Sequence, residues 1–264
     1  MAQVTPGAQA WSADGASEPP GDVGILVVHG FTGNPVSLRP LAEGLAERGF
    51  AVALPRLPGH GTRWQDLQRT TWHDWVREAA AAFQHLRSTT RAQVLVGLSM
   101  GGAIALHLAQ TRAAEVAGLV LINPWLYSSD RRLKALPLLK LAVPAIPGVG
   151  NDICKPGGDE KPYPKVPLKA LASVLALQRQ VRERLPQVLA PTLILTSRHD
   201  HVVEPANSAL VLDSIGSPDS EQRWLEHSYH VATLDHDAPQ ILQATADFAQ
   251  RVAQLGVPKY DAGC

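Results

Sequence analysis

Short apolar runs alternate along this chain with longer segments in which apolar residues recur every three or four positions. The short runs have the length and composition of buried strands, and the longer segments have the period of helices that cover a sheet. Strands are predicted at residues 25–28, 50–54, 94–96, 118–122, 192–196 and 222–226. Helices are predicted at residues 37–48, 74–87, 100–110, 206–215 and 239–253. This alternation predicts an α/β fold, with a mostly parallel sheet and helices on both of its faces.

The alternation stops between Pro124 and Pro191. This segment contains ten of the 21 prolines, with leucine-rich helical pieces at residues 131–142 and 167–185. We interpret residues 124–190 as an insertion into a single domain that spans residues 1–264, and not as a second domain. Residues 1–22 are rich in Ala, Pro, Gly and Ser and predict an exposed tail with at most one short strand, around residues 9–12.

Composition indicates an ordered globular protein. Of the 264 residues, 45% are hydrophobic and 18% are charged, against about 25% charged in an average domain. Disorder is therefore not expected as the main state. The 24 basic and 24 acidic side chains give a net charge of zero, so no nucleic-acid partner is expected.

The cysteines and the apolar runs bear on the compartment. Cys154 and Cys264 do not provide a disulfide framework, and this usage suits the reducing cytosol. Residues 1–7 lack the basic and apolar regions of a signal peptide. No apolar run reaches the roughly 18 residues that span a bilayer, so stable membrane insertion is not expected. We predict a cytoplasmic protein.

Residues that can carry chemistry follow the predicted strands, whose carboxyl ends form the ligand crevice of a parallel sheet. Residues 97–101, Gly-Leu-Ser-Met-Gly, fit the G-x-S-x-G pattern between a strand and a helix rich in small residues. Such a turn exposes its serine as a nucleophile, and flanking glycines leave room for the strained backbone. Ser99 is therefore the candidate nucleophile. The alternative is a glycine-rich turn with an incidental serine.

A serine hydroxyl is a weak nucleophile that needs a base, and the base needs an orienting acid. Asp200 follows the strand predicted at residues 192–196 and is the only carboxylate of its loop before Glu204. His230 follows the strand predicted at residues 222–226. We predict Asp200 as the acid and His230 as the base. The alternatives are an Asx-turn residue for Asp200 and an ordinary loop histidine for His230.

Other histidines compete with His230 or suggest a metal. His227 lies close to the strand end, His236 follows a helical turn later, and His201 adjoins Asp200. These histidines lack partners at zinc-site spacings such as H-E-x-x-H. We therefore expect no metal and no cofactor.

Two backbone N–H groups are the candidate oxyanion donors. One belongs to Phe31, in the His-Gly-Phe-Thr-Gly segment after the first predicted strand, and the other to Met100, directly after the serine. Backbone donors suit this role because the sheet holds them in place before charge develops. Trp125 and Tyr127 follow the fourth predicted strand and fit crevice lining and core packing equally well.

Four segments together resemble the α/β-hydrolase superfamily and, within it, bacterial carboxylesterases and monoacylglycerol lipases. The most specific is Ser-Tyr-His-Val-Ala-Thr-Leu-Asp at residues 228–235, and the others lie at residues 29–33, 97–102 and 199–203. The resemblance covers residues 9–254. It implies the α/β-hydrolase fold and the same site residues: Ser99, Asp200, His230, Phe31 and Met100.

The resemblance also implies that residues 124–190 form a small cap. Gly150-Asn151-Asp152-Ile153 and Tyr163-Pro164 look like the monoacylglycerol lipase cap, whereas Cys154 and residues 156–158 depart from it. Glu160 matches a cap glutamate that holds the glycerol group, and Trp125 is a further candidate for substrate binding. We expect the apolar residues of the first helical piece of this segment to lie beside the crevice: Leu133, Leu136, Leu138, Leu139, Leu141 and Val143.

The implied function is hydrolysis of carboxylic esters through an acyl-enzyme, most simply of monoacylglycerols or similar single-chain esters. Two alternatives use the same triad, namely a thioesterase and an acyltransferase. A third is a non-catalytic lipid-binding protein on the same fold.

Overall fold

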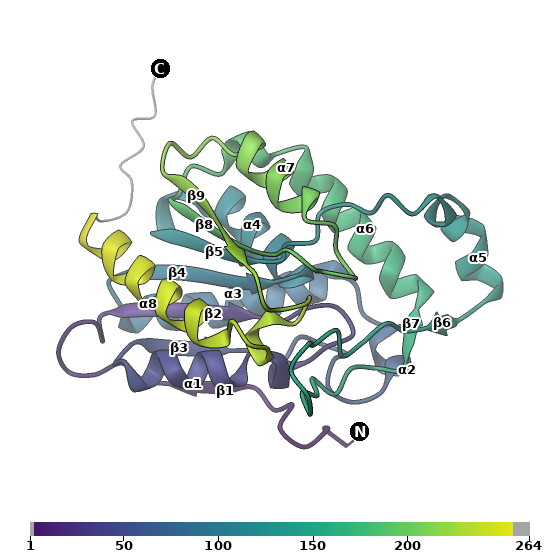
Figure 1. Ribbon diagram of the computed structural model, residues 1–264, viewed down its shortest axis with the longest axis horizontal. Coiled ribbons are helices and arrows are strands. Elements are labelled where there is room, and N and C mark those ends of the chain that lie inside the picture. Colours follow the sequence, from purple (N-terminus) through teal and green to yellow (C-terminus); the bar gives the residue numbers. More distant parts are fainter. Residues whose placement is uncertain (1–2, 256–264) are drawn as a thin grey trace.

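A seven-stranded sheet runs through the computed structural model of this protein, which describes residues 3–255 (Figure 1). The strand order is β1-β3-β2-β4-β5-β8-β9, and every neighbouring pair is parallel except β1 with β3. These strands are β1 (Trp11–Ala13), β2 (Val23–Val28), β3 (Ala51–Leu54), β4 (Ala92–Leu98), β5 (Gly118–Ile122), β8 (Thr192–Ser197) and β9 (Ser220–Leu225). The predicted mostly parallel sheet is confirmed.

Helices cover both faces of the sheet, because its central strands are apolar on both sides. In β2, Ile25 packs in the core beneath α1 and α8, whereas its neighbour Leu26 packs in the core beneath α3 and α4. The helices are α1 (Arg39–Glu47), α2 (Trp64–Leu67), α3 (Trp72–Thr89), α4 (Met100–Thr111), α5 (Leu136–Ala142), α6 (Leu168–Arg182), α7 (Ala206–Ser214) and α8 (Ala238–Leu255). None of them combines the length and apolar character needed to cross a membrane.

The register brings the carboxyl ends of the parallel strands to one edge. Val28 at the end of β2 pairs with Gly97, Leu98 at the end of β4 pairs with Ile122, and β5 pairs with β8 in the same direction. The loops that follow these strands therefore meet at this edge, as expected for a ligand crevice.

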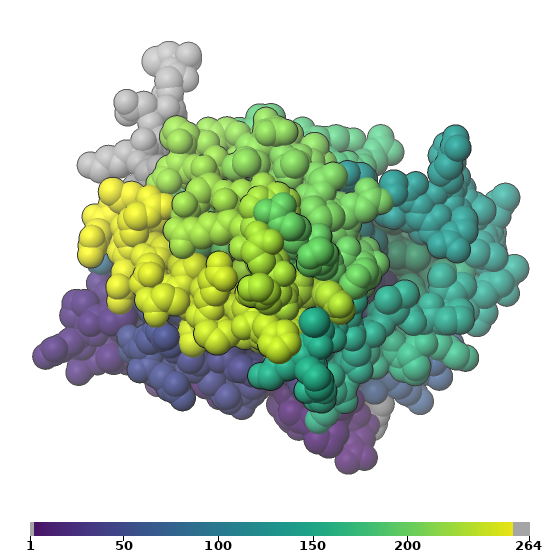
Figure 2. All heavy atoms as spheres, viewed as in Figure 1, coloured from purple at the N-terminus to yellow at the C-terminus, as the bar shows by residue number. Residues whose placement is uncertain are grey.

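The segment between β5 and β8 lies beside the sheet and not within it. It contains α5, α6 and a two-stranded antiparallel sheet of β6 (Ala145–Pro147) and β7 (Lys165–Pro167). Figure 2 shows the teal part of this segment projecting at one end of the molecule. Neither this small sheet nor α2 was predicted. Three-residue, proline-bearing strands and a one-turn helix are too short to produce a periodic pattern.

Candidate active site

Ser99 occupies a strained turn between β4 and α4. Its φ and ψ are 56° and −119°, a conformation that residues with a side chain rarely adopt. The turn is possible because the residues that flank it are glycines and have no Cβ. A Cβ on Gly101 would lie only 2.0 Å from the Val28 carbonyl oxygen. A Cβ on Gly97 would lie 2.4 Å from the Gly101 carbonyl carbon. The two glycines of the motif are thus required by packing against backbone.

Asp200 and His230 meet across the sheet edge, although 30 residues separate them. His230 Nδ1 lies 2.7 Å from Asp200 Oδ2, and both side chains are buried. The other Asp200 oxygen accepts the N–H groups of Val202 and Val203 at 2.8 and 2.7 Å. The carboxylate is therefore fixed by its own loop, and one oxygen is left to orient the imidazole.

The surroundings of His230 shift its pKa. Burial lowers it, but the Asp200 carboxylate raises it through its charge and hydrogen bond, and Glu160 and Asp152 add to this effect. The net result is that the pKa of His230 lies above its ordinary value of 6.5. A protonated His230 is thus stabilised here, as a general base that becomes an imidazolium requires.

Ser99 and His230 line the same cavity. Within residues 3–255, the Ser99 hydroxyl forms no hydrogen bond to the imidazole. Bonds of this kind are often long before a substrate binds and tighten in the complex. The structure thus places the two side chains on one cavity, with the hydroxyl free to approach a bound carbonyl.

The N–H groups of Phe31 and Met100 are both available at this edge. Neither donates a hydrogen bond to another described residue, and Met100 begins α4, where the first N–H groups have no helical partner. His29 holds the neighbouring loop. Its Nε2 accepts the Leu57 N–H at 3.2 Å, so its Nδ1 carries the proton and donates to the Gly30 carbonyl at 3.0 Å.

The cavity over Ser99 has a volume of about 250 Å³ and is lined mostly by apolar side chains. Phe31 and Trp125 line it, with ring centroids 6.5 Å apart, and the 124–190 segment contributes Leu133 and Val149. Tyr127, the other aromatic residue considered for the crevice, does not belong to this lining. The apolar lining suits a hydrocarbon chain.

The expectation for the apolar residues of the first cap helix was largely wrong. Leu133 lines the cavity, and Leu136 packs in a small cluster with Leu168. Leu138 and Leu141, by contrast, are 77% and 76% exposed, and α5 lies at the end of the molecule (Figure 1). The leucines are so closely spaced that they surround the short helix, and only one side of it can face the protein.

Glu160 lines the same cavity and is held by Asn151. The Glu160 N–H donates to the Asn151 side chain at 2.9 Å, and the Asn151 N–H donates back to the Glu160 carboxylate at 3.3 Å. Burial raises the pKa of Glu160, although the charge of His230 opposes this shift. A carboxyl group in this position can accept a hydrogen bond from a substrate hydroxyl.

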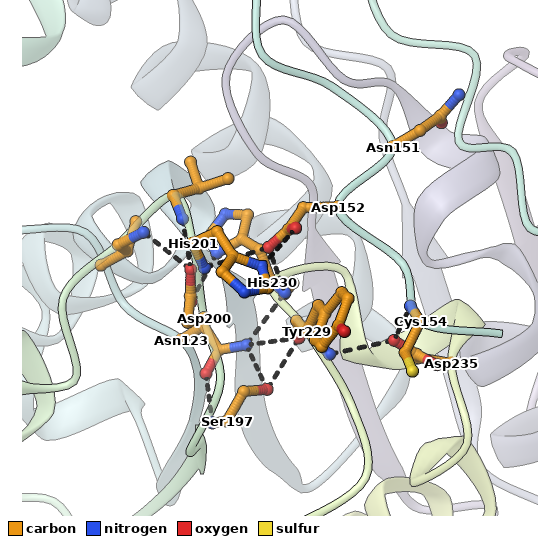
Figure 3. Close-up of polar contacts among 12 residues, drawn as sticks. Asn123, Asn151, Asp152, Cys154, Ser197, Asp200, His201, Tyr229, His230 and Asp235 are labelled. Carbon is orange, nitrogen blue, oxygen red and sulfur yellow. Dashed lines mark hydrogen bonds and ion pairs between the residues drawn. The ribbon is translucent and has the colours of Figure 1, made fainter.

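Two residues of the site were assigned no role from the sequence. Asn123, at the end of β5, donates to the Ser197 hydroxyl and the His230 carbonyl at 2.9 and 2.8 Å and accepts the Ser197 N–H at 2.7 Å (Figure 3). Asp152 contacts the backbone of His230. The position of Asn123 directly after a strand could have suggested its role. Asp152 belongs to the segment at residues 150–153 that resembles the cap, but nothing in the sequence pointed to its contact with His230, which is 78 residues away.

The competing histidines and carboxylates have other partners. His201 lies 2.8 Å from Asp152, whereas His227 and His236 border a separate surface groove. Asp235 accepts four backbone N–H groups, from Cys154, Lys155, Tyr229 and His236.

Only one group of side chains within residues 3–255 has the spacing of metal ligands. It consists of Cys154, Asp235 and His236, whose ligand atoms lie within 4.8 Å of one another. The Asp235 carboxylate already holds three segments of backbone. None of the three residues lines the cavity over Ser99, so this group has no place in the site described above.

Comparison with known proteins finds this chain similar to lipolytic enzymes and esterases. A sequence model of a protein family, described as the alpha/beta hydrolase family, matches residues 25–251. A thermostable monoacylglycerol lipase from Bacillus sp. (strain H-257) is 39% identical over 233 residues, which cover 86% of this chain and 90% of the relative. A carboxylesterase from Bacillus subtilis (strain 168) is 27% identical over 88% of this chain and 94% of its own length.

A solved structure points the same way. It belongs to work on LipS and LipT, two metagenome-derived lipolytic enzymes, and superposes with a TM-score of 0.90 and 40% sequence identity. The similarity covers 94% of this chain and all of the other. Relatives this similar over nearly their whole length share the fold and the general kind of reaction.

Proposed function

Because the chain belongs to the alpha/beta hydrolase family, we propose that it is a serine hydrolase of carboxylic esters in which Ser99, Asp200 and His230 are the catalytic residues. One observation carries the proposal. A serine in a strained strand-to-helix turn shares a cavity with a histidine that is hydrogen-bonded to a buried aspartate. This combination meets the requirements of nucleophilic catalysis by a weakly acidic hydroxyl.

The reaction proceeds in two halves. His230 Nε2 takes the proton from Ser99 as the hydroxyl oxygen attacks the ester carbonyl carbon, and the resulting imidazolium is stabilised by Asp200. His230 then returns the proton to the departing alcohol as the carbon–oxygen bond breaks, which leaves an acyl-serine. A water molecule, deprotonated by His230, cleaves this acyl-enzyme and restores the hydroxyl.

The proposed oxyanion donors are the N–H groups of Phe31 and Met100. Negative charge builds on the carbonyl oxygen only in the tetrahedral intermediate, so donors fixed in advance stabilise it without rearrangement. The neutral, buried His29 supports one of these donors by holding the carbonyl of Gly30. Burial lowers the pKa of His29 to about 4, so it stays neutral at ordinary pH.

We propose that residues 124–190 form a cap over this site within a single domain, and that the favoured substrates are monoacylglycerols and similar single-chain esters. The apolar cavity would take the acyl chain, with Trp125 in its wall, and the Glu160 carboxyl would accept a hydrogen bond from a glycerol hydroxyl. The name of the 39% identical relative, a monoacylglycerol lipase, supports this substrate class. The sparse use of cysteine supports the cytoplasm as its compartment.

Activity-based labelling and a substrate series test the proposal. A fluorophosphonate probe should label the protein but not the Ser99→Ala variant, and a monoacylglycerol should be hydrolysed at least about 10-fold faster than the triacylglycerol, which requires only ~1.4 kcal/mol of discrimination. Absence of labelling would favour a lipid-binding protein. Faster cleavage of acyl-thioesters than of esters would favour a thioesterase.

The role of Glu160 has its own comparison. Glu160→Ala, which removes the acceptor, should weaken turnover of monoacylglycerol more than that of a p-nitrophenyl ester of the same chain length, because only the glycerol ester offers hydroxyls. An equal effect on both esters would remove this residue from substrate recognition and leave the ester hydrolase proposal intact.

A further inference from the structure

Asp152 connects the 124–190 segment to both loops that carry the Asp200–His230 pair. Its Oδ2 accepts the His230 N–H at 3.0 Å and the His201 N–H at 3.2 Å, and its Oδ1 lies 2.8 Å from His201 Nδ1. Its backbone carbonyl accepts the Val231 N–H at 3.1 Å. Figure 3 shows the carboxylate beside the imidazole rings of the two histidines.

The chain around Asp152 is itself held in place. The next residues, Cys154 and Lys155, donate their N–H groups to Asp235 at 2.7 and 2.9 Å, and Asp235 belongs to the loop that follows His230. On the other side, Asn151 exchanges two hydrogen bonds with Glu160. The Asp152 side chain is only 13% exposed. It is therefore a fixed acceptor and not a surface charge.

These contacts matter because the loops that bear Asp200 and His230 are distant in the chain, so only non-covalent contacts hold them at a fixed distance from each other. Asp200 is fixed by its own loop, but the position of the His230 ring depends on the backbone that bears it. Carboxylate acceptors bind N–H groups more strongly than neutral acceptors do. Removal of the carboxylate leaves the N–H groups of His201 and His230 without this partner, and so loosens the imidazole relative to Ser99.

We propose that Asp152 is a positioning residue, which clamps the loops of Asp200 and His230 to the 124–190 segment and so makes a productive triad depend on the seating of that segment. The proposal rests on the function proposed above. In this proposal the 124–190 segment both covers the cavity and holds the catalytic residues in place. Asp152 also lines the cavity over Ser99, but its carboxylate oxygens are engaged by His201 and the His230 N–H, so we assign its effect to the position of His230 and not to contact with the reacting atoms.

The effect of Asp152 on catalysis should appear in kcat. Displacement of a catalytic group by about 1 Å can cost on the order of 100-fold in rate, so Asp152→Ala should lower kcat on p-nitrophenyl butyrate by about 10- to 100-fold with KM nearly unchanged. Asp159→Asn is the matched control, since this exposed acidic side chain of the same segment binds the Lys161 N–H and not the triad loops. Loss confined to KM would overturn the proposal in favour of direct substrate contact.

The Asp152→Asn variant keeps the shape and one acceptor oxygen, and so guards against misfolding of the alanine variant. Three carboxyl groups face His230, namely Asp200 from the β8–α7 loop and Glu160 and Asp152 from the 124–190 segment. Loss of one negative charge should move the acid limb of the kcat/KM profile to lower pH, whereas Asp159→Asn should leave it in place. An unchanged limb together with an unchanged kcat would also overturn the proposal.

Hydrogen exchange tests the clamp without turnover. The amide protons of His201 and His230 should exchange at least about 10-fold faster in both Asp152 variants than in the parent and in Asp159→Asn, since a hydrogen bond protects them. Equal exchange rates would show that Asp152 does not hold these loops. If the parent lacked esterase activity but showed this exchange pattern, the proposed function would fail while the clamp would stand.

Discussion

At the scale of single residues, the site separates groups that react from groups that hold. Ser99 is exposed to the cavity by a strained turn between β4 and α4. His230 is oriented by Asp200, whose Oδ2 lies 2.7 Å from the imidazole Nδ1. Asp235, an acidic residue of the loop that follows His230, instead accepts four backbone N–H groups. Asp200 and Asp235 thus have different tasks, although both contact the loop that bears His230, and their hydrogen-bond partners distinguish them.

Removal of any proposed triad member should abolish most activity without unfolding the protein. Ser99→Ala and His230→Ala should each lower kcat on a p-nitrophenyl ester by more than about 10³-fold, as in other triads. Asp200→Asn should cost less, but still orders of magnitude, because it disturbs the imidazole tautomer. Ser88→Ala, at an exposed position, is the control. Retention of a tenth of the activity by the serine or histidine variant would contradict the assignment.

The pH dependence of kcat/KM follows from the shifted pKa of His230. Only the neutral imidazole can act as the base, so activity should fall as pH decreases through this pKa. Because Asp200, Glu160 and Asp152 together outweigh burial and raise the pKa, the midpoint should lie above the ordinary value of 6.5. A profile of initial rates between pH 5 and 9 measures it, and a midpoint below 6.5 would be contrary to this geometry.

At the scale of elements, the ends of the parallel strands position the chemistry. The elbow depends on contact between β2 and the start of α4, where no Cβ fits at Gly101. The short helix α5 has a different environment. It has one buried leucine, Leu136, and exposes Leu138 and Leu141. Its apolar residues thus fall into a set that faces the protein and a set that does not.

This division predicts which leucines control substrate binding. The double variant Leu138→Ser, Leu141→Ser should leave kcat/KM for a dissolved short-chain ester within about two-fold, because neither side chain lines the cavity. Leu133→Ser should weaken binding increasingly with acyl length, since each buried CH₂ contributes about 0.8 kcal/mol. Steady-state kinetics over esters of four to ten carbons measure both effects. An increase in KM for the double variant, with no increase for Leu133→Ser, would contradict this orientation of α5.

At the scale of the whole molecule, two buried histidines beside the site link stability to pH. The rings of His29 and His60 are fully buried, with centroids 5.0 Å apart. Burial lowers the pKa of His29 to about 4, and burial followed by the charge of His29 lowers the pKa of His60 well below 6.5. Both are neutral in the folded protein, whereas the unfolded chain protonates them near 6.5.

The free energy of unfolding should therefore decrease as pH falls from 6.5 toward 4. The unfolded state binds more protons in this window, and the shift of His29 alone corresponds to roughly 3 kcal/mol at about 1.4 kcal/mol per pH unit. His230 does not reverse this trend, because a raised pKa contributes stability that is already complete below 6.5. Urea unfolding at several pH values measures the slope.

A substitution isolates the contribution of the buried ring. His29→Gln should flatten the dependence between pH 6.5 and 5, whereas His85→Gln, at an exposed position, controls for the loss of a histidine as such. An unchanged slope in the His29 variant would show that this ring does not carry the acid sensitivity.

The sequence was sufficient for the strand–helix alternation and for the fold class. Central parallel strands are buried on both faces, so they appear as continuous apolar runs such as residues 25–28, and their helices keep a clear period. The sequence also singled out Ser99, Asp200 and His230, because each lies in the turn or loop that follows a strand: Ser99 directly after β4, and Asp200 and His230 three and five residues beyond β8 and β9. Their catalytic roles stay predictions, as does the extent of the cap.

Only the tertiary structure decided which side chains meet. Asp152 reaches the His230 backbone across 78 residues, and Asn123 joins β5 to the same loop. No periodicity records such contacts, since they depend on how separate loops pack. The orientation of α5 was decided in the same way. A helix with leucines all around it presents several apolar sides, and only packing against Leu168 and Leu171 selected the one that is buried.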